Sequence, residues 1–511
     1  MPRYAAVDIG SNSVRMLVAE ARPDGDTETL AADRCVTRLG ESVFREGQVS
    51  AKALEGIREA LTPMAAAIRK LDVSGIRAVA TSAVRDTANQ AEFLEEASSI
   101  LGCRVEVISG LEEARLIHLG VQSRWPHPRQ RVLIIDVGGG SAEIIDSDHG
   151  ERREAFSKPL GAVRLREVFL KQDPPDAGEI HRIERYIEEK LAPCLVKIGA
   201  RKFDRAIGTS ATAAAIVSAV HRIPRSRREY ADRMRATLPQ VRKLYKDLIG
   251  RDLAARRKIT GFGPRRAEII IPGAAVFLKT MEAFQVPSVF YSGAGVRDGI
   301  IADLAARGVG RERSMLDRDQ RRVVEQMARR YGVSVPHARQ VAALAHRLFE
   351  SLQPLHKLPP EAGRLLEAAS YLHDVGHFIS DSAHHKHSAY VVQNSGMPGF
   401  TDSERQTIAL LCRFHRRSMP NSRHENFQIL PGDQKQSLLM LLPLLRLADS
   451  LDRSHSQEIE SVGCRLESGS VFIDVRGARP DLDLWAAERV AEVFRNVYGK
   501  ALELRTNRSA G

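Results

Sequence analysis

The sequence has few aromatic residues and no cysteine framework. Phe, Trp and Tyr make up only 5% of the 511 residues, and no segment combines aromatic with basic side chains. Proteins that bind single-stranded nucleic acid stack bases on such aromatics, so we do not expect nucleic acid as a partner. The five cysteines are odd in number, widely spaced and contain no CxxC pair. They predict reduced thiols of a cytoplasmic protein rather than disulfides or a zinc site.

The sequence also lacks an apolar run long enough to cross a membrane. The longest run lies near Ile269 to Leu278, about half of the ~20 residues that a spanning helix needs. Asp8 interrupts the only apolar stretch near the N-terminus, which predicts that no signal peptide is present. We therefore expect a soluble, cytoplasmic protein without a membrane partner.

Charge of one sign is in excess, and the chain is too long for a single hydrophobic core. The formal net charge is +12, which attracts polyanions (nucleic acid, an anionic membrane or polyphosphate) without selecting among them. A length of 511 residues predicts about three or four domains.

Two stretches of the chain repeat one pattern. Tyr4 to Leu17 is YAAVDIGSNSVRML and Ile134 to Ile144 is IIDVGGGSAEI, so each has an apolar run, an Asp, and a turn of small residues before a second apolar run. A strand that ends in Asp-x-Gly and returns as a hairpin brings backbone N–H groups and hydroxyls to one point. The pair, with Asp8 and Asp136, predicts two related lobes that face each other across one phosphate-binding cleft.

The periodicity of the remaining chain predicts two α/β lobes followed by a helical domain. Strands and helices alternate up to about residue 301, and from about 323 to 460 the pattern is helical. A short strand near 471–475 and an amphipathic helix over 484–497 follow. The predicted domains are lobe I, lobe II, a charged linker and the helical domain, at 1–125, 126–306, 307–322 and 323–511.

Further turns could bind phosphate, and one helix start could supply a base. Gly208-Thr209-Ser210 stands between a strand and a helix, where N–H groups and the helix dipole favour an anion. Ser292-Gly293-Ala294-Gly295 is another Gly-rich turn, and none of these turns is a P-loop. Glu112 and Glu113 follow Ser-Gly at a predicted helix N-terminus, where a carboxylate stays ionised and can accept a proton from water.

The segments resemble the exopolyphosphatase / guanosine pentaphosphate phosphatase family, which has an actin-like (duplicated ribonuclease H-like) fold. The matching pieces cover about the first 305 residues in the family's order: AAVDIGSNSVRML, ATSAVRDT, VISGLEEARLIHLGV, IIDVGGGSAEI, AIGTSATAAAI, GPRRAEIIIPGA and SGAGVRDGII. The resemblance implies hydrolysis of a terminal phosphoanhydride, with positioning and electrostatics supplying most of the catalysis.

The resemblance also assigns roles to individual residues. The second Glu of VISGLEEAR maps to Glu113, the implied catalytic carboxylate, and Arg85 is implied as a catalytic arginine that contacts the phosphate. Magnesium and water are implied at Asp8, Asp136 and Glu143. The implied phosphate contacts are Gly10, Ser11, Asn12, Ser13, Arg15, Gly138, Gly139, Gly140, Ser141, Gly208, Thr209, Ser210 and Arg266.

The substrate has two candidates, inorganic polyphosphate and guanosine pentaphosphate. Residues 221–268 hold fifteen Arg or Lys and five Asp or Glu, which fits either a solvated basic face or a track for a long polyanion. A base pocket for the nucleotide cannot be identified from the sequence. A kinase or chaperone on the same fold, and a sensor that binds without turnover, are the rivals from other classes.

The helical region carries a second pattern of histidine and aspartate. His337 opens one predicted helix, adjacent His373 and Asp374 end an apolar helix, and Asp449 lies on a later one. This order resembles the HD metal-dependent phosphohydrolases, which implies a second divalent metal at these four residues and, as an alternative function, nucleotide phosphohydrolysis there. His384, His385, His387, His415 and Asp452 could add ligands. A homodimer is implied by the family resemblance alone.

Overall fold

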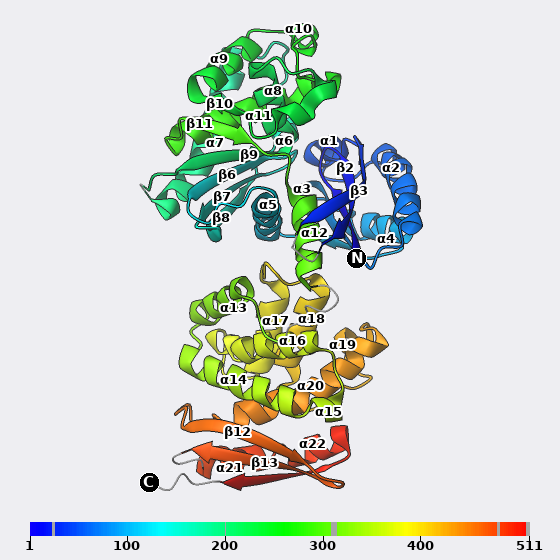
Figure 1. Cartoon of the computed structure of the whole chain (residues 1–511), viewed down its shortest axis with the longest axis vertical. Helices are drawn as coiled ribbons and strands as arrows, with labels where there is room; N and C mark the ends of the chain where they lie inside the picture. Colours follow the sequence, from blue (N-terminus) through cyan, green and yellow to red (C-terminus); the bar gives the residue numbers. More distant parts are fainter. Residues whose placement is uncertain (23–25, 200, 308–313, 478–480, 507–511) are drawn as a thin grey trace. The chain divides into compact units, whose positions relative to one another are not determined.

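The structure is a computed structural model of the whole chain. It describes all residues except 23–25, 200, 308–313, 478–480 and 507–511. Two compact units, Met1–Gly308 and Val309–Gly511, each contain their own hydrophobic core (Figure 1). Of the predicted linker, 308–313 lie outside the described residues, whereas Arg307 ends helix α12 (Val296–Arg307) and residues 318–322 open α13 (Arg318–Arg330).

The first sheet of the first unit has five strands in the order β3-β2-β1-β4-β5. β1 to β3 are antiparallel neighbours, while β4 runs parallel to β1 and β5 parallel to β4. The strands are β1 (Arg3–Ile9), β2 (Val14–Ala21), β3 (Thr27–Cys35), β4 (Gly75–Ala80) and β5 (Val105–Val107). The helices that accompany them are α1 (Leu39–Glu46), α2 (Ala51–Lys70), α3 (Ser82–Arg85) and α4 (Gln90–Leu101).

The second sheet repeats this topology. Its order is β10-β11-β9-β6-β7-β8, with β6 to β8 antiparallel and β9 and β11 parallel to β6. The strands are β6 (Arg131–Val137), β7 (Ala142–Asp148), β8 (Glu151–Lys158), β9 (Arg205–Thr209), β10 (Arg235–Thr237) and β11 (Ser288–Tyr291). Its helices are α6 (Ala162–Phe169), α7 (Ala177–Ile198), α8 (Ser210–Val220), the 3₁₀ helix η1 (Arg225–Ala231), α9 (Leu238–Ile249), α10 (Leu253–Arg257) and α11 (Pro264–Ala283). The duplicated three-antiparallel, two-parallel pattern confirms the predicted two-lobed actin-like fold.

Two helices cross between the lobes. α5 (Gly110–Arg124) packs against β7 and β8, although it precedes them in sequence, and α12 packs against β1 and β2 (Figure 1). The two helices touch closely: a Cβ on Gly120 would lie 2.2 Å from the Gly295 carbonyl oxygen, and one on Gly299 1.8 Å from that of Leu116. Only glycine fits such contacts. The lobe boundaries predicted at residues 125 and 306 follow sequence order and stay predictions.

The second unit is helical with a three-stranded sheet of order β12-β13-β14 near the C-terminus. Its further helices are α14 (Val335–Ser351), α15 (Gln353–His356), α16 (Pro360–Leu372), the 3₁₀ helix η2 (Val375–Phe378), α17 (His384–Asn394), α18 (Asp402–Phe414), α19 (Glu425–Gln428), α20 (Gly432–Ser450), α21 (Asp481–Glu488) and α22 (Ala491–Tyr498). The strands are β12 (Ile459–Leu466), β13 (Ser470–Gly477) and β14 (Ala501–Thr506). The single helix expected over 484–497 is therefore two helices, and β12 and β14 were not predicted.

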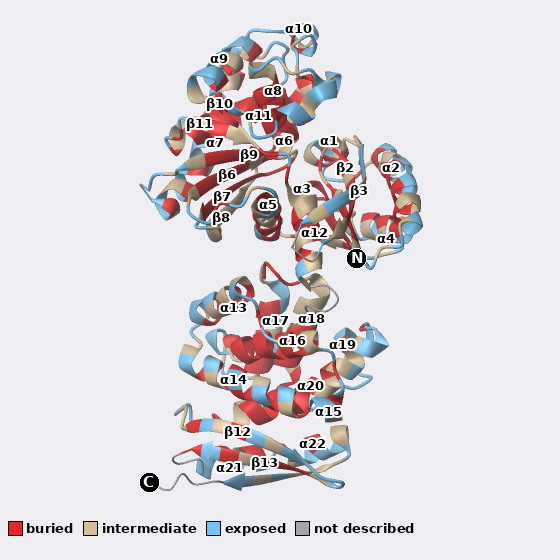
Figure 2. Ribbon diagram, in the orientation of Figure 1, coloured by how far each residue is buried: buried red, intermediate tan, exposed pale blue. Residues whose placement is uncertain are grey.

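Buried side chains follow the same division. The central strands and the faces of α8 and α11 are buried in the first unit, as are the inner faces of α14, α16, α18 and α20 in the second (Figure 2). All five cysteines are free. Among the described residues, no helix combines the length and the apolar character that crossing a bilayer requires.

Candidate active site and a histidine–aspartate centre

The two predicted acidic hairpins have the same turn geometry. The Gly10 N–H donates to the Ser13 carbonyl oxygen at 3.1 Å, and the Gly138 N–H donates to that of Ser141 at 3.0 Å. The turns also face each other, because a Cβ on Gly139 would lie 3.0 Å from the Cβ of Ser11. The repeated sequence thus forms two matching cradles that meet at one place.

A cavity of about 230 Å³ lies between these cradles. The predicted residues that line it are Asp8, Gly10, Ser11, Asn12, Ser13, Arg15, Glu113, Asp136, Gly138, Gly139, Gly140, Ser141, Ser210 and Arg266. Four other predicted residues, Gly208, Thr209, Glu143 and Arg85, do not line it but lie directly behind lining residues or contact them. Lining residues to which sequence reasoning gave no role include Arg34, Arg228, Tyr291 and Arg297.

The start of α8 contributes hydroxyl and N–H groups to the cavity. The Thr209 hydroxyl donates to the Asp136 carboxylate, and the Ser210 hydroxyl donates to the Val137 carbonyl oxygen at 3.0 Å. Ser210 has φ 74, a left-handed conformation that is uncommon for a residue with a side chain. Such strain at a cavity wall and the positive end of α8 both fit an anion-binding role.

Four carboxylates gather on one side of the cavity without a matching number of close cations. Burial raises the pKa of Glu113 well above 4.5, and the Glu143 carboxylate raises it further, while Arg85 acts in the opposite direction. Burial and the nearby Asp136 raise the pKa of Glu143 to about 8. Burial likewise raises the pKa of Asp8 and of Asp136, against the attraction of Arg15. A carboxylate cluster of this kind is stabilised when a cation binds.

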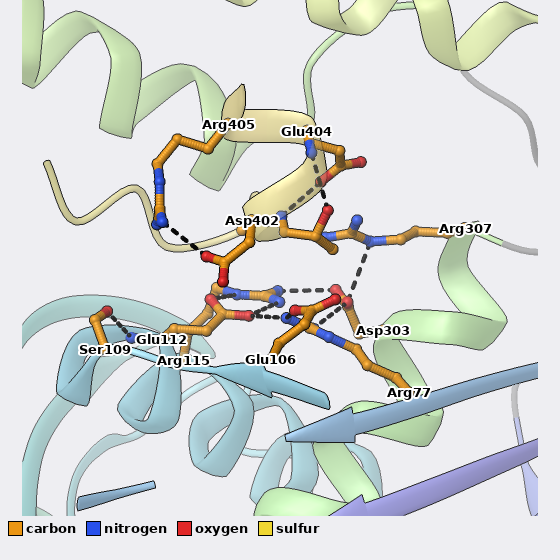
Figure 3. Close-up of polar contacts among 12 residues, drawn as sticks. Arg77, Glu106, Ser109, Glu112, Arg115, Asp303, Arg307, Asp402, Glu404 and Arg405 are labelled. Carbon is orange, nitrogen blue, oxygen red and sulfur yellow. Dashed lines mark hydrogen bonds and ion pairs between the residues drawn. The ribbon is translucent and has the colours of Figure 1, made fainter. Parts of the chain in front are cut away.

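Glu112 and Glu113 are neighbours in sequence but have different surroundings. Glu112 accepts from Arg115 at 2.8 Å and from Arg77 at 3.1 Å, inside a buried ionic network (Figure 3). Glu113 Oε2 is buried without a hydrogen-bond partner, and the Arg85 guanidinium lies 3.8 Å from it. The Arg85 side chain is itself held by a bond to the Ile108 carbonyl oxygen at 2.7 Å. Glu113 is therefore the glutamate available for chemistry, and Glu112 is engaged.

Arginines from five elements line the cavity. They are Arg15 on β2, Arg34 on β3, Arg228 on η1, Arg266 on α11 and Arg297 on α12. Within the described part of the chain, none of the five forms a salt bridge with a carboxylate; Arg228, Arg266 and Arg297 bond instead to neutral oxygens of Ala211, Thr212 and Met16.

The crowding of these guanidinium groups affects their acidity. Burial lowers the pKa of Arg34 to about 9, and repulsion from Arg15 adds to the effect. Burial likewise lowers the pKa of Arg266 to about 9, with Arg34 and Arg228 as the nearest repelling charges. A bound polyanion would relieve this repulsion.

The basic stretch over 221–268 divides into two groups. Arg228 and Arg266 line the cavity. By contrast, Arg242 pairs with Glu282 at 2.7 Å, Arg251 with Asp247 at 2.9 Å and Arg257 with Glu268 at 3.0 Å. The stretch is thus partly a paired, solvated face and partly a wall of the cavity.

The donors of the cavity fit a magnesium ion that also binds phosphate oxygens. Mg²⁺ takes one or two protein carboxylates and completes its shell with water and phosphate. Asp8, Asp136 and Glu143 offer hard oxygen donors, and the unpartnered Glu113 Oε2 lies beside them. Among the described residues, the only His, Cys, Asp and Glu groups whose ligand atoms all lie within 4.8 Å of one another are in the second unit. The cleft is thus not a closed all-protein metal cage.

The second unit brings His337, His373, Asp374 and Asp449 together. His373 Nε2 lies 3.3 Å from Asp449 Oδ1 and 3.7 Å from Asp374 Oδ2, and His337 Nε2 lies 3.8 Å from Asp449 Oδ1. The four side chains come from α14, the end of α16 and α20, which pack together in the core. These four residues, which come from separate parts of the sequence, thus form one cluster in the core of the second unit.

The ring nitrogens of these histidines are arranged as in metal ligands. His337 Nδ1 is bonded to Asp452 at 2.8 Å and His373 Nδ1 to the Ser370 carbonyl oxygen at 2.9 Å. Both Nε2 atoms are buried and have no hydrogen-bond partner. An imidazole oriented through one nitrogen, with the other free toward carboxylates, is the usual form of a metal-binding histidine. The residues present therefore fit a divalent cation.

Additional histidines lie on the other side of Asp374. Asp374 Oδ1 is 3.4 Å from His384 Nε2, 3.6 Å from His377 Nε2 and 3.8 Å from His415 Nε2. Asp374, His377 and His384 make a second group with close ligand atoms, of which His377 was not predicted. His385 and His387, named with them from the sequence, do not line the adjoining cavity.

That adjoining cavity has a volume of about 990 Å³. His337, Asp374, His384, His415 and Asp449 form one part of its lining. The rest of the wall is rich in arginine: Arg416, Arg417, Arg446, Arg453 and Arg489. A hydrolytic metal beside cationic side chains suits a phosphate ester.

The first unit is thus a duplicated actin-like fold around a cleft lined by small-residue turns, carboxylates and arginines. Residues 17–307 match the model of the Ppx/GppA phosphatase family, and residues 320–477 match that of Ppx/GppA phosphatase, domain III. The chain belongs to the Ppx/GppA phosphatase family and is a phosphatase of that family.

Solved structures of relatives match about three fifths of this chain. A Ppx/GppA family member from Aquifex aeolicus is 30% identical, with a TM-score of 0.53, over 60% of this chain and 98% of its own. An exopolyphosphatase-like protein is 28% identical, with a TM-score of 0.56, over 60% of this chain and 98% of its own. An exopolyphosphatase from Cytophaga hutchinsonii, 24% identical over 59% of this chain and 97% of its own, with a TM-score of 0.56, shares the fold.

Proposed function

We propose that this chain is an exopolyphosphatase that hydrolyses the terminal phosphoanhydride of inorganic polyphosphate. The observation that carries the proposal is the set of five arginines that line the same cavity as Glu113, none of which pairs with a described carboxylate. A linear chain of phosphates supplies negative charge at regular spacing and would neutralise several of them at once. A solved relative is itself named an exopolyphosphatase-like protein.

In this proposal, Glu113 accepts a proton from a water molecule whose oxygen attacks the terminal phosphorus. The bond from that phosphorus to the bridging oxygen breaks, and the shortened chain leaves with the bridging oxygen, so the products are orthophosphate and a polyphosphate shorter by one unit. Burial and the neighbouring carboxylates raise the pKa of Glu113, so its ionised carboxylate is a stronger base than that of a solvated glutamate. Arg85 lies beside Glu113, where it would hold the carboxylate and balance charge.

The cradles and the arginines position the substrate. The N–H groups of Gly139 and Gly140 and the hydroxyls of Ser11 and Ser141 would surround the terminal phosphate, while the Gly10 and Gly138 N–H groups close the two turns. Asp8, Asp136 and Glu143 would hold magnesium, which neutralises phosphoryl oxygens when bound. Arg15, Arg34, Arg228, Arg266 and Arg297 bind the phosphates that follow.

Guanosine pentaphosphate is the rival substrate for the same site. The aromatic side chain of the lining, Tyr291, has its hydroxyl engaged with Arg228, so it belongs to the charged wall rather than to a base pocket. Phosphate release should be measured with polyphosphates of graded length and with guanosine pentaphosphate, with and without magnesium. A higher kcat/KM for long polyphosphate supports the proposal, and a higher value for the nucleotide would replace it. Binding without turnover would instead make the protein a sensor.

The histidine–aspartate centre supports a second candidate function. We propose that it binds a divalent metal and hydrolyses a phosphate ester such as a nucleotide, because two buried Nε2 atoms lack partners beside a cavity with an arginine-rich wall. Activity toward nucleotides that survives Glu113→Gln but is lost in Asp374→Ala would assign the reaction to this centre. If the activity is instead lost in Glu113→Gln and kept in Asp374→Ala, the histidine–aspartate centre has no hydrolytic role. The cytoplasmic location and the homodimer stay predictions.

A further inference from the structure

Four buried charged residues form a closed ring at the start of α5. Arg115 donates to Glu112 at 2.8 Å and to Asp303 at 2.9 Å, and Arg77 donates to Glu112 and to Asp303, both at 3.1 Å (Figure 3). Each side chain is at most 8% exposed. The ring joins β4, α5 and α12, and Arg307 adds a further contact to Asp303 at 3.1 Å.

The ring fixes the part of the backbone that carries Glu113. The Glu112 N–H donates to the Ser109 hydroxyl at 3.2 Å, so residue 112 is held by both its backbone and its side chain. Glu113 has much less support of its own, since Oε2 has no hydrogen-bond partner and Arg85 lies 3.8 Å away. The place of the Glu113 carboxylate therefore depends on its immediate neighbour.

The ring also connects the base to the opposite wall of the cavity. Asp303 lies on α12, whose first turn carries Arg297 in the cavity lining. α12 thus presents a phosphate-facing arginine near its start and an anchor for α5 near its end. The close approach at Gly120 and Gly299 leaves little freedom for one helix to slide past the other.

We infer that Arg77, Glu112, Arg115 and Asp303 are positioning residues, which hold the Glu113 carboxylate within proton-transfer distance of the water that attacks the bound anhydride. The inference rests on the proposed function. A general base displaced by a fraction of an ångström to 1 Å still occupies the site, yet the chemical step slows greatly. Loss of the ring should therefore lower kcat and leave substrate binding to the arginines and cradles unchanged.

The test is a double-mutant cycle on the full-length protein with long-chain polyphosphate and magnesium. Asp303→Asn removes one charge with little change of shape, and we expect kcat to fall about 10-fold with KM within about twofold. In the Glu113→Gln background the same substitution should lower kcat no further, because no base remains to be positioned. Losses that multiply in the double variant would overturn the inference.

Asp146→Asn is the matched control. Asp146 is buried and accepts two bonds from Arg131, at 2.9 and 2.6 Å, within the second sheet and outside the cavity lining. We expect this variant to lose a buried ion pair without loss of kcat, and an equal fall in kcat would contradict the inference. If the Asp303→Asn variant does not fold, Arg77→Lys replaces it, because lysine keeps the charge but not both contacts. An unchanged kcat in Arg77→Lys would also overturn the inference. If Glu113→Gln alone keeps near-normal kcat, the proposed function fails instead.

Discussion

The cleft of the first unit and the histidine–aspartate centre of the second both bury several carboxylates, but they balance that charge differently. In the cleft, burial raises the pKa of Asp8, Asp136, Glu113 and Glu143. The five arginines that line the same cavity form no salt bridge with a described carboxylate. In the centre, burial alone would raise the pKa of Asp374 and Asp449, yet neighbouring imidazoles bring both below 3.8.

This difference indicates what each site takes up. In the proposed function, the cleft would take a cation at its carboxylates and an extended anion at its arginines, as hydrolysis of a charged chain needs. In the centre, Asp374 and Asp449 outweigh burial and raise the pKa of His373 to about 9, so the cluster favours positive charge, which a bound metal ion would also supply. On these proposals, the first site is organised around its substrate and the second around its metal.

The largest expected effect tests the cleft of the first unit. Glu113→Gln should lower kcat for phosphate release from polyphosphate by about 10²-fold or more, the range of a lost general base. KM should change little, because the arginines still bind the chain. Glu189→Gln, on the exposed face of α7 where Glu189 pairs with Arg185, is the control. Near-normal turnover in the Glu113 variant would rule out the assigned base.

The second prediction tests the centre. Asp374 contacts both groups of histidines, so Asp374→Ala should reduce affinity for a divalent metal by at least about 10²-fold, the upper end reported for residues that merely orient ligands. The measurement is metal content and titration of the full-length protein with Mn²⁺ or Zn²⁺. Asp433→Ala, at the exposed start of α20, should keep the metal. Wild-type protein without near-stoichiometric metal would make the ligand assignment untenable.

The third prediction tests whether the arginines that line the cavity bind the substrate. Arg34→Gln should raise KM for long polyphosphate about 10-fold, the loss of a charge-assisted contact, and leave kcat within about twofold. The dependence of KM on salt should become less steep, since one fewer charge attracts the chain. Arg185→Gln, an exposed residue paired with Glu189 at 3.2 Å, should change neither quantity. An unchanged KM for Arg34→Gln would remove Arg34 from the substrate path.

The cradles could be predicted because their chemistry is local in sequence. Asp8 and Asp136 each precede a turn whose hydrogen bonds form within four residues, so each motif folds in the same way wherever it stands. The same holds for Gly208 to Ser210 at the start of α8. The histidine–aspartate cluster was also accessible, since its members occupy ends of apolar helices that must pack together.

Two features could not be predicted because they exist only in the tertiary structure. They are the set of arginines that line the cavity and the packing of α5 and α12 on each other's sheets. Arg34 lies on β3, a largely exposed strand without apolar alternation, and Arg228 lies on a short 3₁₀ helix without any motif. That α5 packs on the later sheet and α12 on the earlier one depends on the fit at Gly120 and Gly299. For the same reason the helix-start pattern by itself offered both Glu112 and Glu113, and only the family resemblance selected Glu113.

The smallest expected effect is the pH dependence of the ring that supports Glu113. Burial would raise the pKa of Asp303, but Arg115, Arg307 and Arg77 outweigh it, so the pKa lies far below 3.8 in the folded protein. A depressed pKa contributes stability that is present above the unfolded value and is lost as the pH falls below it. Asp303→Asn should therefore destabilise the protein by about 3 kcal/mol at neutral pH, the cost of breaking a buried ion pair. The gap between the unfolding free energies of the wild type and the variant, measured in urea, should be constant between about pH 7 and 5. At pH 3.5 this gap should be smaller by about 0.6 kcal/mol. A gap that does not depend on pH would mean that Asp303 stabilises the fold through packing rather than through its charge, and the contrast between a ring of satisfied charges and a cleft of unsatisfied ones would then be lost.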